Sequence, residues 1–295
     1  MSAQLAPAAQ SSGVFYNEPA EVYYRKRLDE CNATGMKHML RSPAHFKHYI
    51  ETEEEDDTLS KSFGRMFHCA SLEPDVFART YMVLPENAPR DLRRFRDAKK
   101  PSVETLTSIE WWDKWEADNR GKVMVSRADY DKSQFMGDSV RAHPVAAGLL
   151  AGGHREVTMR WADEETGIAC KLRADLYEPA EFMMDLKSCM DASEEGFARA
   201  IAGYKYDMQG AHYLDGVRAN SDRIKWFIFL ACESTAPFVC QPYVLNVDAE
   251  ERGWKLRQKA IKRQAECLRT GQWPGYSDSI KEISLPTWAY YGIED

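Results

Sequence analysis

The spacing of apolar residues changes near residue 150, and this change limits the possible folds more than any other feature of the sequence. Before that point, apolar side chains recur at three- and four-residue steps, which is typical of amphipathic helices. After it, three segments alternate apolar and polar residues as half-buried strands do, at 156–161, 168–177 and 182–189. A helix, two strands and a long helix are then expected at 192–216, 224–232, 238–247 and 248–270. This order of elements predicts an α/β fold.

The chain is expected to form one domain after a short tail. Residues 1–20 are rich in Ala, Ser and Pro and are expected to be disordered. Residues 21–295 are expected to form a single domain, helical at 21–150 and with an α/β core at 151–295. In the helical part, Ser42 and Pro43 have the residue types of an N-cap and a first helical position. The acidic run at 53–57 is expected to be a solvated loop, and 127–150 a further helix.

Composition excludes several classes of protein. No stretch approaches the roughly 20 apolar residues of a membrane span, and the first residues do not resemble a secretory signal, so a cytoplasmic protein without a membrane partner is expected. The seven cysteines are scattered without a CxxC pair, which argues against a zinc ribbon or an iron–sulfur cluster and favours free thiols. The net charge of -7 argues against a generally basic nucleic-acid-binding surface, so any DNA contact is expected to be local.

Charged residues interrupt the apolar pattern of the strand at 182–189. Side chains two residues apart on a strand point the same way, so Asp185 and Lys187 are expected on one face. Their neighbours Met184 and Leu186 are expected on the other face. An ammonium and a carboxylate in so apolar a strand are costly to bury without a function.

The preceding strand repeats this arrangement. Its apolar residues are expected to share one face and its polar residues the other, with Leu172, Ala174 and Leu176 opposed to Arg173, Asp175 and Tyr177. If the two strands pair, Asp175 and Asp185 converge, with Lys187 beside them. Glu156, on the strand before, is a candidate third carboxylate.

This cluster suits metal-dependent hydrolysis of a phosphodiester. Carboxylate oxygens are ligands for Mg²⁺ or Mn²⁺, and two such ions can hold the attacking and leaving oxygens. Lys187 could position the attacking water, lower its pKa or neutralise charge in the transition state. The alternative interpretation is an ion pair on a surface strand with an unrelated Asp upstream.

Four motifs in one order make the chain resemble a known group of nucleases. They are Gly64-Arg65-Met66-Phe67-His68, Asp175, Asp185-Leu186-Lys187 and Gln209-Gly210-Ala211-His212-Tyr213. This order resembles the RecB-like branch of the PD-(D/E)xK superfamily, although Ala174 replaces the proline of the motif name. Longer stretches, such as GRMFHCASLEPDVF and MMDLKSCMDAS, are similar to exonuclease VIII-type (RecE-like) phage recombination exonucleases, which are related to lambda exonuclease.

The resemblance implies a restriction-endonuclease-like core, with a central mixed sheet flanked by helices and a helical N-terminal elaboration. It implies roles in catalysis or metal binding for Asp175, Asp185, Lys187, Gln209, Tyr213, His68 and Leu186, with Glu156 as an additional carboxylate. Two Mg²⁺ or Mn²⁺ ions per active site are implied. Gly64 is expected to let the sheet approach the helix of His68 closely.

Other interpretations of these residues remain open. His68 could be packed in the core, and Gln209 and Tyr213 could serve only to pack their helix on the sheet. Contacts to DNA are expected from Arg41, Arg173 and Lys205. The basic runs at 90–96 and 252–263 are either phosphate-binding tracks or ordinary solvated faces.

The resemblance also implies an activity. A Mg²⁺-dependent exodeoxyribonuclease would digest linear double-stranded DNA from 5′ to 3′ into mononucleotides and leave 3′ single strands for annealing recombination. A homo-oligomeric ring, trimer or tetramer, and a single-strand annealing protein as partner are implied. The alternatives are an endonuclease or repair nuclease of the same fold, and a catalytically silent DNA-binding protein.

Overall fold

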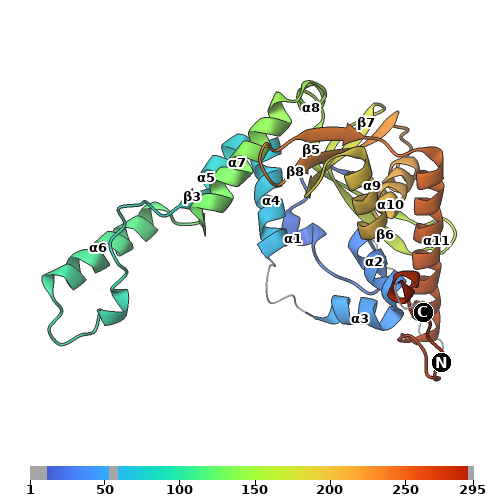
Figure 1. The fold of residues 1–295 in the computed structure, drawn as a ribbon, viewed down its shortest axis with the longest axis horizontal. Coiled ribbons are helices and arrows are strands. Elements are labelled where there is room, and N and C mark those ends of the chain that lie inside the picture. The colour runs from blue at the N-terminus through green and yellow to red at the C-terminus, as the bar shows by residue number, and fades with distance from the viewer. Residues whose placement is uncertain (1–11, 53–58, 292–295) are drawn as a thin grey trace.

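A mixed β-sheet forms the centre of the molecule (Figure 1). The computed structural model describes residues 12–52 and 59–291. The sheet has the strand order β1-β5-β6-β7-β8-β9, with β2 paired to β6; the pairs β7–β8 and β2–β6 are parallel and the others antiparallel. Its strands are β1 (Gly13–Phe15), β2 (Glu30–Cys31), β5 (His154–Ala162), β6 (Ala169–Glu178), β7 (Phe182–Cys189), β8 (Trp226–Glu233) and β9 (Cys240–Tyr243).

Helices cover both faces of this sheet, as expected from the sequence. One layer consists of α2 (Ala33–Arg41), α3 (Pro43–Glu51), α9 (Glu194–Tyr204), α10 (Tyr206–Ala219) and α11 (Val247–Thr270). The other consists of α4 (Leu59–Leu72), α7 (Arg127–Ala142) and α8 (Pro144–Leu150). Two further helices are α1 (Ala20–Tyr23) and α5 (Pro74–Thr80). Within the described ranges, no helix combines the length and apolar character needed to cross a membrane.

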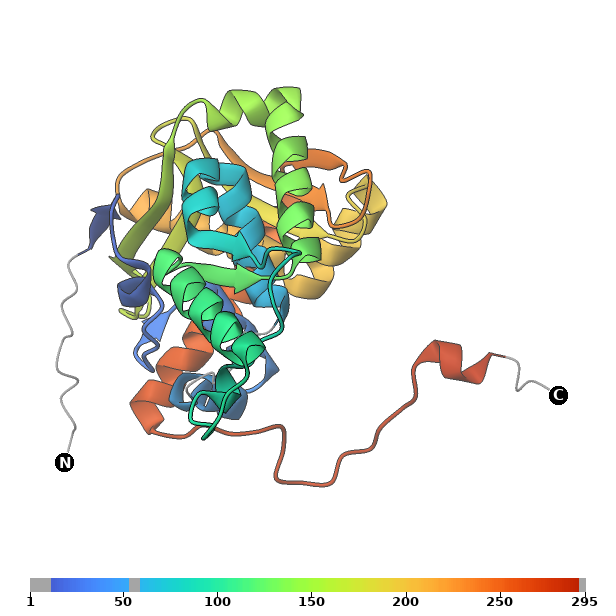
Figure 2. The same cartoon turned by 90° about the vertical axis from the view of Figure 1, so that its left-hand side faces the viewer.

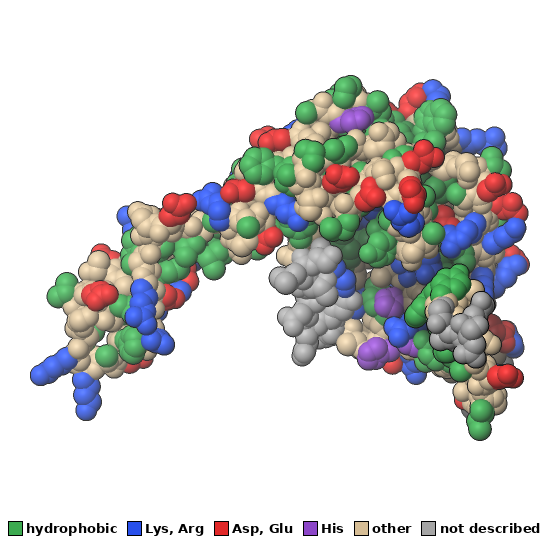
Figure 3. All heavy atoms as spheres, viewed as in Figure 1, with side chains coloured by type: hydrophobic (Ala, Val, Ile, Leu, Met, Phe, Trp, Pro, Cys, Tyr) green, Lys and Arg blue, Asp and Glu red, His purple; other side chains and the backbone are tan. Residues whose placement is uncertain are grey.

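Two segments project from this body (Figures 1 and 2). The first is an arm between β3 (Tyr81–Val83) and β4 (Val123–Val125), which pair in parallel; the arm contains η1 (Arg93–Phe95) and α6 (Val103–Asp118). The second follows α11, runs away from the sheet and contains η2 (Thr287–Tyr290). Lys and Arg side chains gather at the far end of the arm (Figure 3).

The N-terminal part is more ordered than its composition suggests. Residues 12–20 were expected to be disordered, but β1 pairs with β5 and Glu18 forms an ion pair with the buried Arg160. β2 pairs with β6, so the part expected to be only helical also supplies a strand to the sheet. Residues 1–11 of the expected tail, and the acidic run at 53–57, lie outside the described residues.

Two helices predicted as continuous are broken. The segment 127–150 divides at His143, because Pro144 has no N–H to donate and disfavours a helical conformation in the residue before it. The segment 192–216 divides at Lys205, whose φ of 57° and ψ of 45° are left-handed. The predicted start at Ser42 is confirmed, since its hydroxyl accepts a hydrogen bond from the His45 N–H at 3.2 Å.

Candidate active site

The site lies at a fork in the sheet where β6 and β7 separate. The two strands pair from Glu178 opposite Phe182 to Leu176 opposite Met184, and one further step of this register would place Asp175 opposite Asp185. The ladder ends there, so the main-chain N–H of Leu186 has no carbonyl across from it. The carboxylate of Asp175 accepts that N–H instead, at 2.6 Å. The fork therefore brings the two predicted carboxylates together.

Asp185 is held from two directions. Lys187, two residues along β7, forms an ion pair with its Oδ2, and Gln209 on α10 donates to its Oδ1 at 2.6 Å. Met184 and Leu186 pack in the hydrophobic cluster of α4 and α7, on the opposite side of the strand, as expected. The alternation of β7 thus separates its polar pair from the core.

Asp175 is also flanked by two side chains from other elements. In the register of β5 and β6, Glu156 occupies the position opposite Asp175. From α4, His68 places its Nδ1 3.3 Å from Asp175 Oδ1. One ligand atom from each of these three residues lies within 4.8 Å of the other two. His68 therefore lies in one cluster with Asp175 and Glu156.

The backbone of β5 is distorted at this point. Glu156 has a φ of 55°, which a residue with a side chain rarely adopts in a strand. Its carboxylate accepts a hydrogen bond from Arg173 Nε at 2.6 Å. Such strain persists only where surrounding contacts maintain it, and it often marks a functional site.

Burial and neighbouring charges shift the pKa values of the site in opposite directions. Burial raises the pKa of Asp185 despite the opposing charge of Lys187. Burial acts in the same direction on Asp175, but the neighbouring His68 holds the pKa of Asp175 below its usual value. The pKa of Glu156 is raised by burial and by the charge of Asp175. The pKa of His68 is raised, because the Asp175 carboxylate outweighs the effect of burial.

The donor set fits a divalent cation. Two carboxylates and an imidazole converge, with the carboxylate of Asp185 close enough to interact with Asp175, and oxygen ligands of this kind suit Mg²⁺ or Mn²⁺. The Oδ2 atom of Asp185 is buried and lies against the ammonium of Lys187, which balances its charge. The side chain of Leu186 points into the core, so only its main chain can take part in the site.

Other predicted residues occupy positions at or outside the edge of the cluster. The hydroxyl of Tyr213 donates to the main-chain carbonyl of Arg173 in β6 at 2.9 Å and also contacts the side chain of Gln209. Arg173 itself bonds to Glu156 and to the Glu18 carbonyl at 3.0 Å. Lys205 marks the break between α9 and α10.

Arg41 and Gly64 are two further residues for which a role was expected. Arg41 lies at the end of α2, where its Nε donates to the hydroxyl of Tyr276 at 3.3 Å. The expected close approach at Gly64 is not found among the described residues, since a Cβ atom added there would meet none of them within 4 Å.

The apolar residues of β6 do not all share one face. Leu172 and Ala174 pack in the cluster that includes α10 and α11, whereas Leu176 packs with α4 and α7. The expectation of a single apolar face along β6 is therefore wrong. The side chains before and after Asp175 therefore pack on different faces of the sheet. Asp175 itself lies opposite Glu156, where the backbone of β5 is distorted.

Two residues beside the site were not anticipated from the sequence. The ammonium groups of Lys187 and Lys37 lie over the ring of Tyr206, at 4.7 and 5.1 Å from its centroid. Lys37 comes from α2, and burial followed by the charge of Lys187 lowers its pKa to about 8. No motif marks Lys37, because only the packing of α2 against α10 brings it here. Tyr206 could have been noticed as the first residue of α10, three before Gln209.

The basic run of α11 has one buried member and several exposed ones. Arg257 is fully buried and forms ion pairs with Asp163 and Asp215, so it helps to hold the fold together. Arg252, Lys255 and Lys262 lie at the surface, each with an acidic partner. In the arm, Arg93 and Arg96 also have acidic partners, at Asp91, Glu116 and Asp113.

Comparisons with known proteins agree with this architecture. The family described as a PDDEXK-like domain of unknown function (DUF3799) matches residues 32–286. A solved structure described as a putative exonuclease from Eubacterium rectale covers 94% of this chain and 99% of its own, with a TM-score of 0.58 and 13% identity, and shows a shared fold. A second, named SSO0001, covers 68% of this chain and 85% of its own at 16% identity, with a TM-score of 0.28, too low to define a shared fold. No curated protein sequence matches significantly.

Proposed function

The chain belongs to the family of PDDEXK-like domains, and on this premise we propose that it is a metal-dependent exodeoxyribonuclease acting on linear double-stranded DNA. One observation carries the proposal: the fork between β6 and β7 brings together Asp175, Asp185 and Lys187, with His68 and Glu156 beside them. This is a hydrolytic set for a phosphodiester. It is complete in this chain, which argues against a silent DNA-binding protein.

The residues of the cluster divide into metal ligands and residues that act on the phosphate or on the ligands. His68, Glu156, Asp175 and Asp185, with the main chain of Leu186, would hold Mg²⁺ or Mn²⁺, which in two-ion sites activates water and stabilises the leaving oxygen. Lys187 places a positive charge beside the reacting phosphate and offsets the negative charge that develops there. Gln209 fixes the orientation of Asp185. Arg173 neutralises and orients Glu156.

The finer features of the activity come from the resemblance to exonuclease VIII-type enzymes. We propose digestion from 5′ to 3′, release of mononucleotides and a remaining 3′ strand for a single-strand annealing partner. We also propose two metal ions per site and a ring of three or four subunits. A ring can present a basic inner surface while the chain as a whole has a net charge of -7.

Digestion of end-labelled duplex DNA tests the proposal. Linear duplexes labelled at either the 5′ or the 3′ end are incubated with the full chain in Mg²⁺, Ca²⁺ or EDTA. We expect rapid release of the 5′ label as mononucleotide in Mg²⁺, with the 3′ label retained longer. Ca²⁺ is expected to support binding of DNA with little cleavage, because it is a larger ion than Mg²⁺ and its coordination geometry is less rigid.

The same assay separates the alternatives. A covalently closed circle would be cut by an endonuclease or repair nuclease but not by an enzyme that needs a DNA end. Asp185→Asn preserves the shape of the side chain and an acceptor for Gln209, so it is the matched inactive variant. Equal rates for this variant and the wild type would refute the assigned site. Binding without release of either label would refute catalysis.

A further inference from the structure

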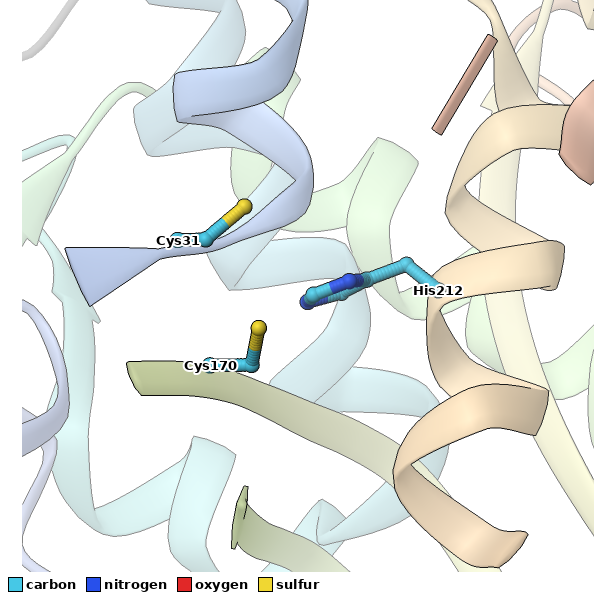
Figure 4. A group of neighbouring side chains, drawn as sticks. All are labelled: Cys31, Cys170 and His212. Atoms are coloured by element: carbon cyan, nitrogen blue, oxygen red, sulfur yellow. The ribbon is translucent and has the colours of Figure 1, made fainter. Parts of the chain in front are cut away.

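Two cysteines and a histidine meet inside the core, apart from the carboxylate site (Figure 4). Cys31 on β2 and Cys170 on β6 are register partners of two parallel strands, and His212 on α10 extends its ring between them and the helix. All three side chains are buried, with exposed fractions of 0%, 1% and 0%. Three separate elements thus bring two sulfur atoms and an imidazole to one place.

The ligand atoms are close enough to bind one ion. One ligand atom from each residue lies within 4.8 Å of the other two. In a tetrahedral zinc site with Zn–S bonds of about 2.3 Å and a Zn–N bond of about 2.0 Å, ligand atoms lie about 3.5–3.8 Å apart. Side-chain movements of about 1 Å are therefore sufficient to close the site around an ion.

The protonation of His212 is suited to metal binding. Its Nε2 lies 3.0 Å from the main-chain carbonyl of Lys171, and because a carbonyl only accepts, Nε2 carries the proton. The lone pair is therefore on Nδ1, which is buried and has no hydrogen-bond partner among the described residues. Burial and the charge of Arg257 lower the pKa of His212 to about 3, so the ring is neutral. An imidazole that donates one N–H to a carbonyl is the usual arrangement of a metal-binding histidine.

We propose that Cys31, Cys170 and His212 bind a thiophilic divalent metal ion, for which Zn²⁺ is the best fit. Thiolate and imidazole ligands select such ions over Mg²⁺. Two thiolates cancel the charge of the ion after their protons pass to solvent, so the complex is neutral, as a fully buried position requires. Three protein ligands leave one position for a water molecule.

The position of the site suggests what the ion would do. β2 consists of two residues, Glu30 and Cys31, and is the only strand of the described N-terminal helical part that pairs with β6. α2 follows directly and carries Lys37 to the edge of the active site. α10 carries Gln209 three residues before His212. An ion joining β2, β6 and α10 would fix the elements that position these two side chains.

Metal analysis and cobalt substitution test the proposal. The full chain is purified under reducing conditions with zinc supplied, and the zinc content is measured after dialysis. We expect about one zinc ion per chain. Replacement with Co²⁺ should produce a thiolate-to-cobalt charge-transfer band, which the carboxylates and His68 cannot produce because they contain no sulfur.

Matched variants locate the ion. Cys31→Ser and Cys170→Ser should lose the zinc and the cobalt band, whereas Cys267→Ser, a buried cysteine of α11 outside the cluster, should retain both. Asp185→Asn should also retain both, which separates this site from the proposed catalytic one. A wild-type chain without zinc and without the cobalt band would overturn the proposal, and this result does not depend on the folding of any variant. A band that persists in the Cys31→Ser variant, or a disulfide between Cys31 and Cys170 in protein purified under reducing conditions, would also overturn it.

Discussion

Gln209 and Tyr213 share one side of α10, one helical turn apart, and each donates to a different strand of the sheet. Gln209 donates to the carboxylate of Asp185, whereas the hydroxyl of Tyr213 donates to the Arg173 carbonyl in β6. The motif that contains both residues therefore combines an orienting contact with a structural one. Substitution of each residue should separate the two effects.

Gln209→Leu is expected to lower the cleavage rate by about 10-fold to 100-fold and to raise the Mg²⁺ concentration needed for half-maximal activity. The reason is that residues that orient metal ligands typically contribute this much to affinity or activity. Initial rates measured across a Mg²⁺ series, with circular dichroism as a control for folding, check the prediction.

Tyr213→Phe is the matched comparison for Gln209→Leu. Loss of its hydroxyl leaves the Arg173 carbonyl without this donor and is expected to cost about 1 kcal/mol of stability, with little change in the rate or the Mg²⁺ requirement. Equal kinetic losses in the two variants would contradict the division of roles.

Lys37 offers a second prediction at this scale. Its ammonium lies over the ring of Tyr206, as does that of Lys187, so it adds positive charge near the carboxylates. If it stabilises the reacting phosphate, Lys37→Met should lower kcat by about 100-fold at saturating DNA. Lys47→Met, on the exposed surface of α3, is the control and should be unchanged. A loss confined to KM would instead indicate that Lys37 only binds DNA.

Sequence reasoning located part of this site and missed part of it, for a physical reason. Asp175, Asp185 and Lys187 follow from the two-residue period of strands, which is a local rule. Lys37 approaches them only through the packing of α2 against the rest of the fold, and no local pattern contains that information. The distortion at Glu156 is equally invisible, since nothing in the residue type favours a φ of 55°.

At the scale of elements, the same limit explains which strands were found. β5, β6 and β7 are long enough to show alternation, but β1 and β2 have three and two residues and show no period. The two-residue period also failed along β6, where the apolar side chains change clusters around Asp175. The prediction assumes that every second residue of a strand lies on the same face. β6 does not meet this assumption, because the strand changes its orientation at Asp175.

The contact between α10 and α11 depends on one glycine. A Cβ atom added at Gly253 would lie 2.2 Å from the main-chain oxygen of Asp207. A main-chain atom of α10 cannot move aside without displacing the helix that carries Gln209. The close approach of these helices therefore has a strict size requirement at Gly253.

Gly253→Ala is expected to lower the free energy of unfolding by about 1–3 kcal/mol, because it forces two helices apart in a packed region. Gly203→Ala, in α9, meets none of the described residues within 4 Å and is expected to stabilise by up to about 1 kcal/mol through helix propensity. Urea unfolding midpoints of both variants check the prediction. If Gly253→Ala were as stable as the wild type, the close contact of α10 and α11 would be refuted.

At the scale of the whole molecule, the distribution of charge and apolar surface differs between the body and its projections. Many basic residues of the body are used in internal ion pairs, as with Arg160, Lys171 and Arg257. The segment after α11 instead exposes apolar side chains: Ile280, Ile283 and Trp288 have exposed fractions of 101%, 86% and 71%. A series of such side chains on one extended segment is typical of a surface that is covered in an assembly.

The final prediction follows from that segment and from the proposed ring. We expect the full chain to sediment as a trimer or tetramer at micromolar concentration, and a chain ending at Asp278 to shift toward monomer. This truncation retains Tyr276, which contacts Arg41 and His45, so the body should keep its fold. Analytical ultracentrifugation measures the shift, and the thermal unfolding of the truncated chain controls for folding. A truncated chain that stays oligomeric would place the interface elsewhere. A monomeric full chain would remove the ring, and the carboxylate site would then act on DNA ends without an enclosing channel.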